Sequence, residues 1–438
     1  MRRMVRLFVA AAFGVSLLAA SAGAQAEAGG RLPPLVVFDT EISGAPGDQQ
    51  WPAIAWNATD NEYLVVWQDT RNLGTRGHDI YGRRLDALGS PIGADFRISG
   101  PQALKDEYEP AVAWSRMANR YLVVWRDGRD LLGKGDEIFG RVLAADGTPV
   151  GGDKRISSPK ATQNEYQPDI VWNQTSGRFL VVWMDGRNLG SRGWDVYGRL
   201  VKTDGKPSGR DRRISGPRAT SNEGRPAVAW DQTGNRYLVV WEDERGPVAR
   251  GQDIYGRLLN SNLQPIGGDH RISGPKATSD EHEPDVAWNG SAGRHVVVWR
   301  DERNDGTTGD DIYGRVVGTN GRPVGGDKHI SSPAAVANEY RPAVACHQAT
   351  GSCLVVWDDG RDQLLRGFDI IGRRIGADGK ATGGELQVSG TAATSDESTP
   401  ALACSQDDNR YLVVWQDWRN DGYPLYHGID LYGRRVSG

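Results

Sequence analysis

One apolar string that ends in Trp recurs at a fixed interval and limits what the chain can fold into. The first copy is YLVVW at residues 63–67, and the second begins at Tyr121, 58 residues further on. The seven copies begin at Tyr63, Tyr121, Phe179, Tyr237, His295, Cys353 and Tyr411. A fixed period of this length predicts a repeat architecture in which each unit buries its apolar faces against its neighbours. This prediction overrides the two or three domains that 438 residues would otherwise suggest.

Each repeat contains four segments with the character of short strands. In the second repeat they are Pro110–Trp114, Tyr121–Trp125, a third strand opened by Glu137–Arg141, and Val150–Ser157. The second of these is apolar on both faces, as expected for a strand between two packed layers. Asp146-Gly147 is a tight-turn signal before the fourth strand. Four short strands per repeat are typical of a propeller blade, so seven repeats predict an all-β, single seven-bladed β-propeller.

The two ends of the chain complement each other. The last repeat stops at Val436, after its third strand, and lacks a fourth. At the other end, Leu35–Ser43 (LVVFDTEIS) matches the fourth strand of the repeats. We therefore expect the N-terminal strand to complete the seventh blade and close the ring, which a closed propeller requires and an open solenoid does not.

The first residues have the pattern of a bacterial Sec-type signal peptide. Arg2, Arg3 and Arg6 precede an apolar run, Leu7–Ala20, and small residues follow it. The run is shorter than the roughly 18 to 20 residues that a membrane span needs. We expect residues 1–26 to be a signal peptide, residues 27–438 to be the propeller, and the protein to be secreted, periplasmic or on the cell surface, with no membrane span.

The charge of the chain bears on its binding partners. The formal net charge is -4 and Lys and Arg are scattered, so nucleic acid is not expected as a partner. We expect a monomer.

Cys346 and Cys353 flank a short segment between two strands and form either a disulfide or a buried thiol pair. Cys404 replaces a recurring Trp and is expected to be a small core residue.

Most of the 15 tryptophans follow the repeat. Seven occupy the position of Trp67 and five more the position of Trp56, and recurrence at one register predicts packing between blades. Trp51, Trp194 and Trp418 fall outside both registers.

A charged signature, Trp-x-Asp-x-Arg, follows the second strand in all seven repeats. Its residues are Asp69 and Arg71, Asp127 and Arg129, Asp185 and Arg187, Asp243 and Arg245, Asp301 and Arg303, Asp359 and Arg361, and Asp417 and Arg419. Acidic residues such as Asp79 open the third strand, and a Glu such as Glu107 precedes the first strand of the next repeat in six cases. These groups are predicted to gather on one rim of the propeller.

Two interpretations of this rim remain open. Each Arg could bridge acidic groups of its own and the adjacent blade through paired hydrogen bonds. Alternatively, each blade could offer an equivalent saccharide or cation site. An Arg in every repeat would oppose a divalent ion, so no metal and no cofactor are expected.

The signature resembles the TolB-type or WD-like β-propeller repeat. It reads Trp183-Met184-Asp185-Gly186-Arg187-Asn188, followed by Asp195-Val196-Tyr197-Gly198. The resemblance covers nearly the whole chain after the signal peptide and implies the propeller fold. The chain differs from TolB in having seven repeats rather than six and no separate N-terminal domain, so the periplasmic partner role of TolB is not implied.

Catalytic strings are missing from the sequence, which has no Gly-x-Ser-x-Gly motif and no pattern among its seven histidines. No catalytic residue is therefore predicted. The symmetry breaks where the ends meet, because the last rim loop is longer than its counterparts. Six residues there are predicted to form an aromatic, hydrogen-bonding patch for a sugar or peptide: Gln49, Trp51, Trp418, Tyr423, Tyr426 and His427. The alternative is that this irregularity only reflects the meeting of the termini.

Taken together, the recurrence and the missing catalytic strings favour an exported, non-catalytic binding or scaffold protein. Its rim would recognise a protein partner or a glycan. The alternative is a propeller hydrolase or lyase that acts on an extracellular polysaccharide or peptide at the central channel.

Overall fold

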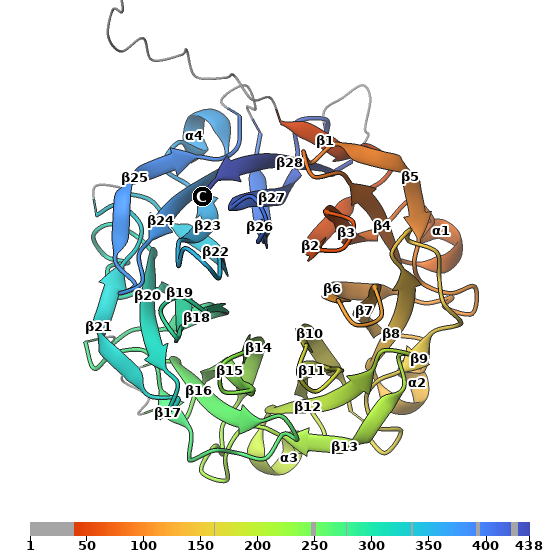
Figure 1. The fold of residues 1–438 in the computed structure, drawn as a ribbon, viewed down its shortest axis with the longest axis horizontal. Helices are drawn as coiled ribbons and strands as arrows, with labels where there is room; N and C mark the ends of the chain where they lie inside the picture. The colour runs from red at the N-terminus through yellow and green to blue at the C-terminus, as the bar shows by residue number, and fades with distance from the viewer. Residues whose placement is uncertain are drawn as a thin grey trace, which may run out of the picture. The chain divides into compact units, whose positions relative to one another are not determined.

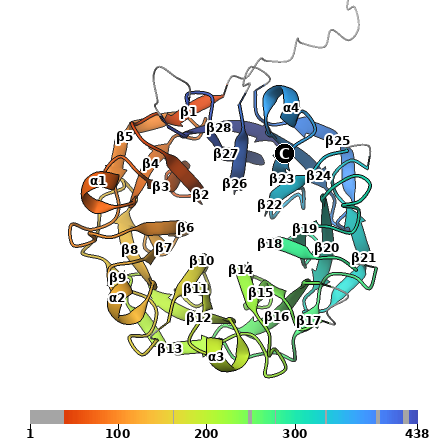
Figure 2. The same ribbon diagram turned by 180° about the vertical axis from the view of Figure 1, so that it is seen from behind.

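The computed structural model describes residues 39–438 except 162, 247–250, 277, 334–335, 391–394 and 422–427. Seven four-stranded antiparallel sheets stand as blades around a ring (Figure 1). Each innermost strand contacts the innermost strands of its two neighbours, and the first contacts the last. Figure 2 shows the same ring from behind. The predicted seven-bladed β-propeller is confirmed.

The strands occupy four positions in each blade, from the channel outward. The innermost strands are β2 (Gln49–Asn57), β6 (Glu107–Ser115), β10 (Glu165–Asn173), β14 (Glu223–Asp231), β18 (Glu281–Asn289), β22 (Glu339–Cys346) and β26 (Glu397–Ser405). The second strands are β3 (Glu62–Asp69), β7 (Arg120–Asp127), β11 (Arg178–Asp185), β15 (Arg236–Asp243), β19 (Arg294–Asp301), β23 (Cys353–Asp359) and β27 (Arg410–Asp417).

The third and fourth positions complete each blade. The third strands are β4 (Asp79–Leu85), β8 (Glu137–Ala144), β12 (Asp195–Lys202), β16 (Asp253–Asn260), β20 (Asp311–Gly318), β24 (Asp369–Ile375) and β28 (Asp430–Ser437). The outer strands are β5 (Pro91–Arg97), β9 (Lys154–Arg155), β13 (Pro207–Arg213), β17 (His270–Arg271), β21 (Pro323–His329), β25 (Ala381–Gln387) and β1 (Thr40–Ser43). Single-turn helices follow four of the second strands: α1 (Leu73–Arg76), α2 (Leu131–Lys134), α3 (Leu189–Arg192) and α4 (Gln363–Arg366).

The ring closes through the N-terminal strand. Strand β1 pairs antiparallel with β28, and Thr40 faces Gly433 across the pair. The last blade therefore takes its outer strand from the start of the chain, as the sequence predicts.

Apolar contacts between blades form the core. Trp67 and its six equivalents are fully buried. Trp299 of the fifth blade, for example, lies in one cluster with Leu238 and Val240 of the fourth. Burial of each such aromatic side chain contributes about 1.5–3 kcal/mol, so the recurring Trp sets the spacing of the blades.

The innermost strands differ from the prediction and carry a bulge. Strand β6 begins at Glu107 rather than Pro110, and its register with β7 shifts between Tyr108 and Ala111. Glu109, inside this bulge, has a left-handed φ of 54°. Every blade repeats this feature at the residue before its first Pro, which turns that residue away from the regular strand.

Three smaller features complete the description. Cys346 and Cys353 face each other across β22 and β23 and form a disulfide, with an S–S distance of 2.00 Å. Cys404 is buried and unpaired with another cysteine. Among the described residues, the helices are single turns, and none is long and apolar enough to cross a bilayer.

Candidate active site at the channel mouth

The charged signature forms a compact unit within each blade. In the second blade, Trp125 Nε1 donates to Asp127 Oδ2 at 2.9 Å. Arg129 donates to the same carboxylate with Nε at 2.8 Å and Nη2 at 2.6 Å. The Arg129 guanidinium also lies 4.0 Å from the centre of the Phe139 ring. One Asp thus satisfies both the core Trp and the Arg.

An acidic residue that the sequence analysis missed completes each unit. Arg129 Nη2 lies 3.0 Å from Asp153 Oδ2, and this carboxylate accepts the Gly100 N–H of the preceding blade at 3.0 Å. The equivalent acids of the seven blades are Asp39, Asp95, Asp153, Asp211, Asp269, Asp327 and Glu385. Each rim Arg therefore pairs with acids of its own blade, and the acid makes the contact to the preceding blade. This geometry supports a structural role for the rim, which stays a prediction.

The recurring Glu is also internal. Glu107 is fully buried, and its Oε2 accepts the Ile80 N–H of the preceding blade at 3.3 Å. Burial raises the pKa of Glu107 to about 9. Asp79, which opens the third strand, accepts a hydrogen bond from Asn72 Nδ2 at 2.9 Å. Glu107 thus joins two blades, and both Glu107 and Asp79 are buried away from a ligand.

The patch predicted at the closure of the ring is only partly described. Gln49 is fully buried and donates to the carbonyls of Ala45 and Gly47, so it cannot reach a ligand. Trp418 is half-buried on the rim, and its backbone N–H donates to Asp396 O at 3.0 Å. Trp51 is 44% exposed, and it lines the central channel. Tyr423, Tyr426 and His427 lie outside the described residues.

A pocket of about 270 Å³ opens where the innermost strands begin, and we call it the channel mouth. Its lining is one residue per blade and the Pro that follows it: Trp51, Glu109, Gln167, Arg225, Glu283, Arg341 and Thr399, with Pro52, Pro110, Pro168, Pro226, Pro284, Pro342 and Pro400. The seven residues before Pro are those with left-handed φ, from 44° to 56°. Pro recurs in every blade, but the residue before it changes from blade to blade. Seven-fold symmetry is therefore lost where the blades converge.

A circle of hydrogen bonds fixes these residues. The N–H of each one donates to a side chain of the preceding blade, at 2.7 to 3.2 Å. The acceptors, in order from Trp51 to Thr399, are Gln416, Gln68, Glu109, Gln167, Glu242, Glu283 and Asp358. A left-handed conformation before Pro is strained, and such strain persists where the surroundings enforce it, often at functional sites.

The carboxylates of the mouth sit in different environments. Glu283 accepts Arg225 Nη1 at 2.8 Å and the Arg341 N–H at 2.7 Å. Burial raises the pKa of Glu109, against the effect of a hydrogen bond from the Gln167 N–H. Burial also acts on Glu242, but His282 and Arg225 outweigh it and lower its pKa. Environments that separate the pKa values of neighbouring carboxyl groups are the condition for acid–base chemistry.

Two further carboxylates directly follow the Pro of their innermost strands, at a position where the other blades have Ala. Asp169 Oδ2 accepts the Val228 N–H, and Asp285 Oδ2 accepts the Val344 N–H, both at 2.7 Å. Each thus links its innermost strand to the next. Burial and the charge of Asp285 raise the pKa of Asp169 to about 7, and burial raises that of Asp285 to about 6.

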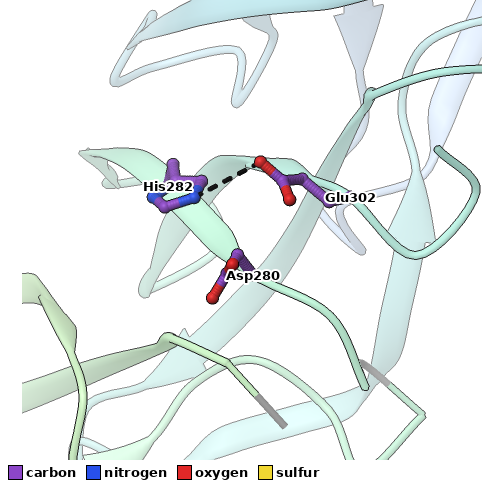
Figure 3. A group of neighbouring side chains, drawn as sticks. All are labelled: Asp280, His282 and Glu302. Atoms are coloured by element: carbon purple, nitrogen blue, oxygen red, sulfur yellow. Dashed lines mark ion pairs between the residues drawn. The ribbon is translucent and has the colours of Figure 1, made fainter. Parts of the chain in front are cut away.

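A cluster in the fifth blade, next to the mouth, has the residue types of a metal site (Figure 3). One ligand-type atom each from Asp280, His282 and Glu302 lies within 4.8 Å of the others. His282 Nε2 is 3.4 Å from Glu302 Oε1, but Arg300 Nη2 is nearer, at 2.8 Å. A guanidinium beside this carboxylate opposes a second cation. We interpret the cluster as an ion-pair network at the edge of the mouth.

Comparisons with known proteins give a fold and no family. No family model and no curated protein sequence matches the chain. An α-L-arabinanase of Penicillium chrysogenum, solved with arabinobiose, is similar in structure with a TM-score of 0.52 and 15% identity, over 78% of this chain and 99% of that one. The α-L-arabinofuranosidase Arb93A of Fusarium graminearum, solved with an iminosugar inhibitor, gives 0.52 and 14%, over 92% and 98%. A puromycin hydrolase gives 0.52 and 13%, over 87% and 52%.

This comparison corrects the functional expectation from the sequence. A non-catalytic binding or scaffold protein was favoured because no catalytic string was found, and the similar propellers are instead hydrolases. The physical reason for the error is that a propeller needs no local string. Glu109 and Glu283 lie three repeats apart, and the ring brings them to one pocket. The only signal in the sequence was the variable residue before each recurring Pro.

Proposed function

We propose that this protein is an exported glycoside hydrolase that cleaves a neutral polysaccharide at the channel mouth. The observation that carries the proposal is the loss of seven-fold symmetry in one pocket, where two glutamates stand in different environments. The likeness to arabinan-cleaving propellers supports the class of substrate. Removal of residues 1–26 as a signal peptide is part of the proposal.

The two glutamates are placed to act on one bond from two sides. Glu109 belongs to the second blade and Glu283 to the fifth, so in a ring of seven they lie nearly opposite each other across the mouth. One carboxylate oxygen of each accepts the N–H of the mouth residue in the next blade, Gln167 or Arg341, at 2.7 Å. Their positions are therefore fixed before substrate binds, as acid–base catalysis requires.

Their surroundings assign the roles. Burial raises the pKa of Glu109 and so favours its protonated form, and we assign Glu109 as the general acid that protonates the leaving glycosidic oxygen as the C–O bond breaks. Arg225 Nη1 and the Arg341 N–H both donate to Glu283 and orient its carboxylate, and we assign Glu283 to take a proton from the attacking water. The hydroxyl group of that water bonds to the anomeric carbon.

The charges of the mouth also select the substrate. Arg225 is paired with Glu283, and Arg341 Nη1 is 2.5 Å from Asp358 Oδ2. A sugar carboxylate would have to displace one of these acids. We therefore expect a neutral polysaccharide to be preferred over a uronic acid polymer.

The test is release of reducing ends from a panel of neutral polysaccharides, with arabinan included. Glu109→Gln and Glu283→Gln should each lower kcat by about 10²–10⁴-fold. Glu62→Gln is the matched control. Glu62 begins β3 and pairs with Arg84, at the end of the first blade that faces away from the mouth. The proposal is wrong if the wild type cleaves no member of the panel, or if either mouth variant keeps full activity.

A further inference from the structure

We propose that an aromatic arc beside the channel mouth binds sugar units next to the scissile bond, so that the protein prefers a polymer to a small glycoside. This inference rests on the proposed hydrolase function. The arc consists of His78, Tyr108, Arg126, Tyr166 and Trp194, which come from the first three blades.

The arc is continuous. The rings of His78 and Tyr108 lie 4.6 Å apart, and those of Tyr166 and Trp194 lie 5.2 Å apart. The Arg126 guanidinium fills the space between the two pairs, 5.0 Å from the centre of Tyr108 and 4.2 Å from that of Tyr166. All five side chains are half-buried. They therefore form one surface with part of each side chain accessible to solvent.

The arc is also held in place. Arg126 Nη2 is 2.7 Å from Asp136 Oδ2, which fixes the central guanidinium. His78 Nδ1 lies 3.0 Å from Asp106 Oδ1, which orients the imidazole, and the backbone N–H of Trp194 donates to Asn222 Oδ1 at 3.2 Å, which fixes the main chain that carries the indole. A surface whose side chains are already ordered loses little conformational entropy when a ligand binds.

Its place in the fold links it to the mouth. Tyr108 and Tyr166 directly precede Glu109 and Gln167, two of the mouth residues. A glycan with one bond at Glu109 would thus extend over the arc. Aromatic faces suit the C–H faces of sugar rings, while the hydroxyl, indole and guanidinium groups can bond to sugar hydroxyls.

Among the described residues, the other blades do not extend the arc into a closed circle. The residues equivalent to Tyr108 in the first, fourth, fifth and seventh blades are Gln50, Gly224, His282 and Ser398. In the sixth blade, Tyr340 lies 5.8 Å from Phe368 and has the Arg300 guanidinium 4.6 Å from its ring centre, so part of the arrangement recurs there over a shorter length. Among the described residues, the longer run, with four rings and one guanidinium in contact, lies over the first three blades, and we assign the glycan chain to that side.

The experiment compares the double variant Tyr166→Ala/Trp194→Ala with the wild type. Each is run by electrophoresis in gels that contain arabinan, arabinoxylan or galactan, and retardation gives the affinity. We expect about a ten-fold or greater loss of affinity for the polymer that retards the wild type. Trp172→Ala is the control, since Trp172 is a half-buried aromatic residue at the opposite end of the same strand, β10. Thermal unfolding checks that all variants are folded.

Kinetics provide the second measurement. On a cleaved polymer the double variant should show a raised KM, with kcat/KM for a small aryl glycoside unchanged. Unchanged retardation and unchanged KM would overturn the arc even if the hydrolase is real. Failure of all three polymers to retard the wild type would also overturn it. Retardation that the double variant loses, in a protein that cleaves nothing, would support the arc and reject the hydrolase.

Discussion

At the scale of single residues, the Trp-x-Asp-x-Arg unit shows how one carboxylate organises a blade. Asp127 accepts the indole N–H of Trp125 and both donors of Arg129. Burial disfavours the charged guanidinium, but the hydrogen bonds to Asp127 and Asp153 outweigh it and raise the pKa of Arg129. Removing the charge of this Arg, or its paired hydrogen bonds through Nε and Nη2, would leave buried acids without a partner.

We therefore expect Arg129→Lys to destabilise the protein by about 1–3 kcal/mol, because an ammonium group cannot form the paired hydrogen bonds or stack on Phe139. Urea denaturation measures the change. Arg116→Lys, in an exposed turn, is the control and should be neutral. Equal losses of unfolding free energy for the two substitutions would contradict a stabilising role for the paired hydrogen bonds of Arg129.

The protonation of Glu109 gives a second prediction at this scale. A general acid acts only while protonated, so kcat/KM should fall as pH rises through the pKa of Glu109, which burial raises. The pH profile on an active polymer measures this. In Glu109→Gln the alkaline limb should disappear from the residual activity, and persistence of the same limb would assign it to another group.

At the scale of elements, the bulge of each innermost strand decides where side chains go. Glu109 and its counterparts leave the regular strand with a positive φ, and a side chain from the preceding blade accepts the freed N–H. The strain is distributed over seven blades and is opposed by seven hydrogen bonds. These hydrogen bonds hold the backbone of the mouth in its left-handed conformation.

The closing strand β1 is the element on which the ring depends. Ile42 is fully buried with Leu412 and Leu431 of the last blade. We expect Ile42→Ala to cost about 2–5 kcal/mol and to raise hydrogen exchange in β28, the strand that pairs with β1. Ile214→Ala, the equivalent change in the third blade, should leave exchange in β28 unchanged, and faster exchange there would show that the effect is not local.

How much the sequence could predict differs between these elements. The period and the split last blade were sufficient for the ring, because a repeat and its missing strand are properties of the chain itself. The bulge was not predicted, since Glu107–Glu109 carries no turn signal and its conformation depends on Gln68 of the neighbouring blade. The outer strands also differ from the prediction, because β9 spans Lys154–Arg155 and not the whole of Val150–Ser157.

At the scale of the whole molecule, a ring of buried carboxyl groups couples stability to pH. Burial raises the pKa of Glu107 and of Glu339 to about 9, and that of Glu223 to about 8. In the unfolded chain these groups ionise near pH 4.5. Between those values the folded protein binds more protons than the unfolded chain. The stability that these groups contribute is therefore fully present below about pH 4.5 and is lost as pH rises through their folded pKa.

We therefore expect the melting temperature to fall steadily from about pH 5 to about pH 9. Calorimetry or circular dichroism measures it in buffers of equal ionic strength. Glu107→Gln keeps the shape without the titration and should reduce the slope. A melting temperature that rises with pH over this range would show that these carboxyl groups are ionised in the fold.

The sequence by itself determined the blade, the number of blades, the closing strand and the Trp core, because each of these recurs at one register and needs no knowledge of distant contacts. It also placed the charged signature on one rim. The TolB-type resemblance, the monomeric state and the signal peptide stay predictions.

Only the tertiary structure decided what the channel contains. Glu109 and Glu283 are 174 residues apart in the sequence. They line the same pocket because the blades that carry them are arranged around one ring. The partner of each rim Arg was decided in the same way, because Asp153 reaches Arg129 only when the outer strand folds back on its blade. A repeat reveals its common positions in the sequence, but the residues that differ between repeats acquire a shared function only after the ring brings them to one place.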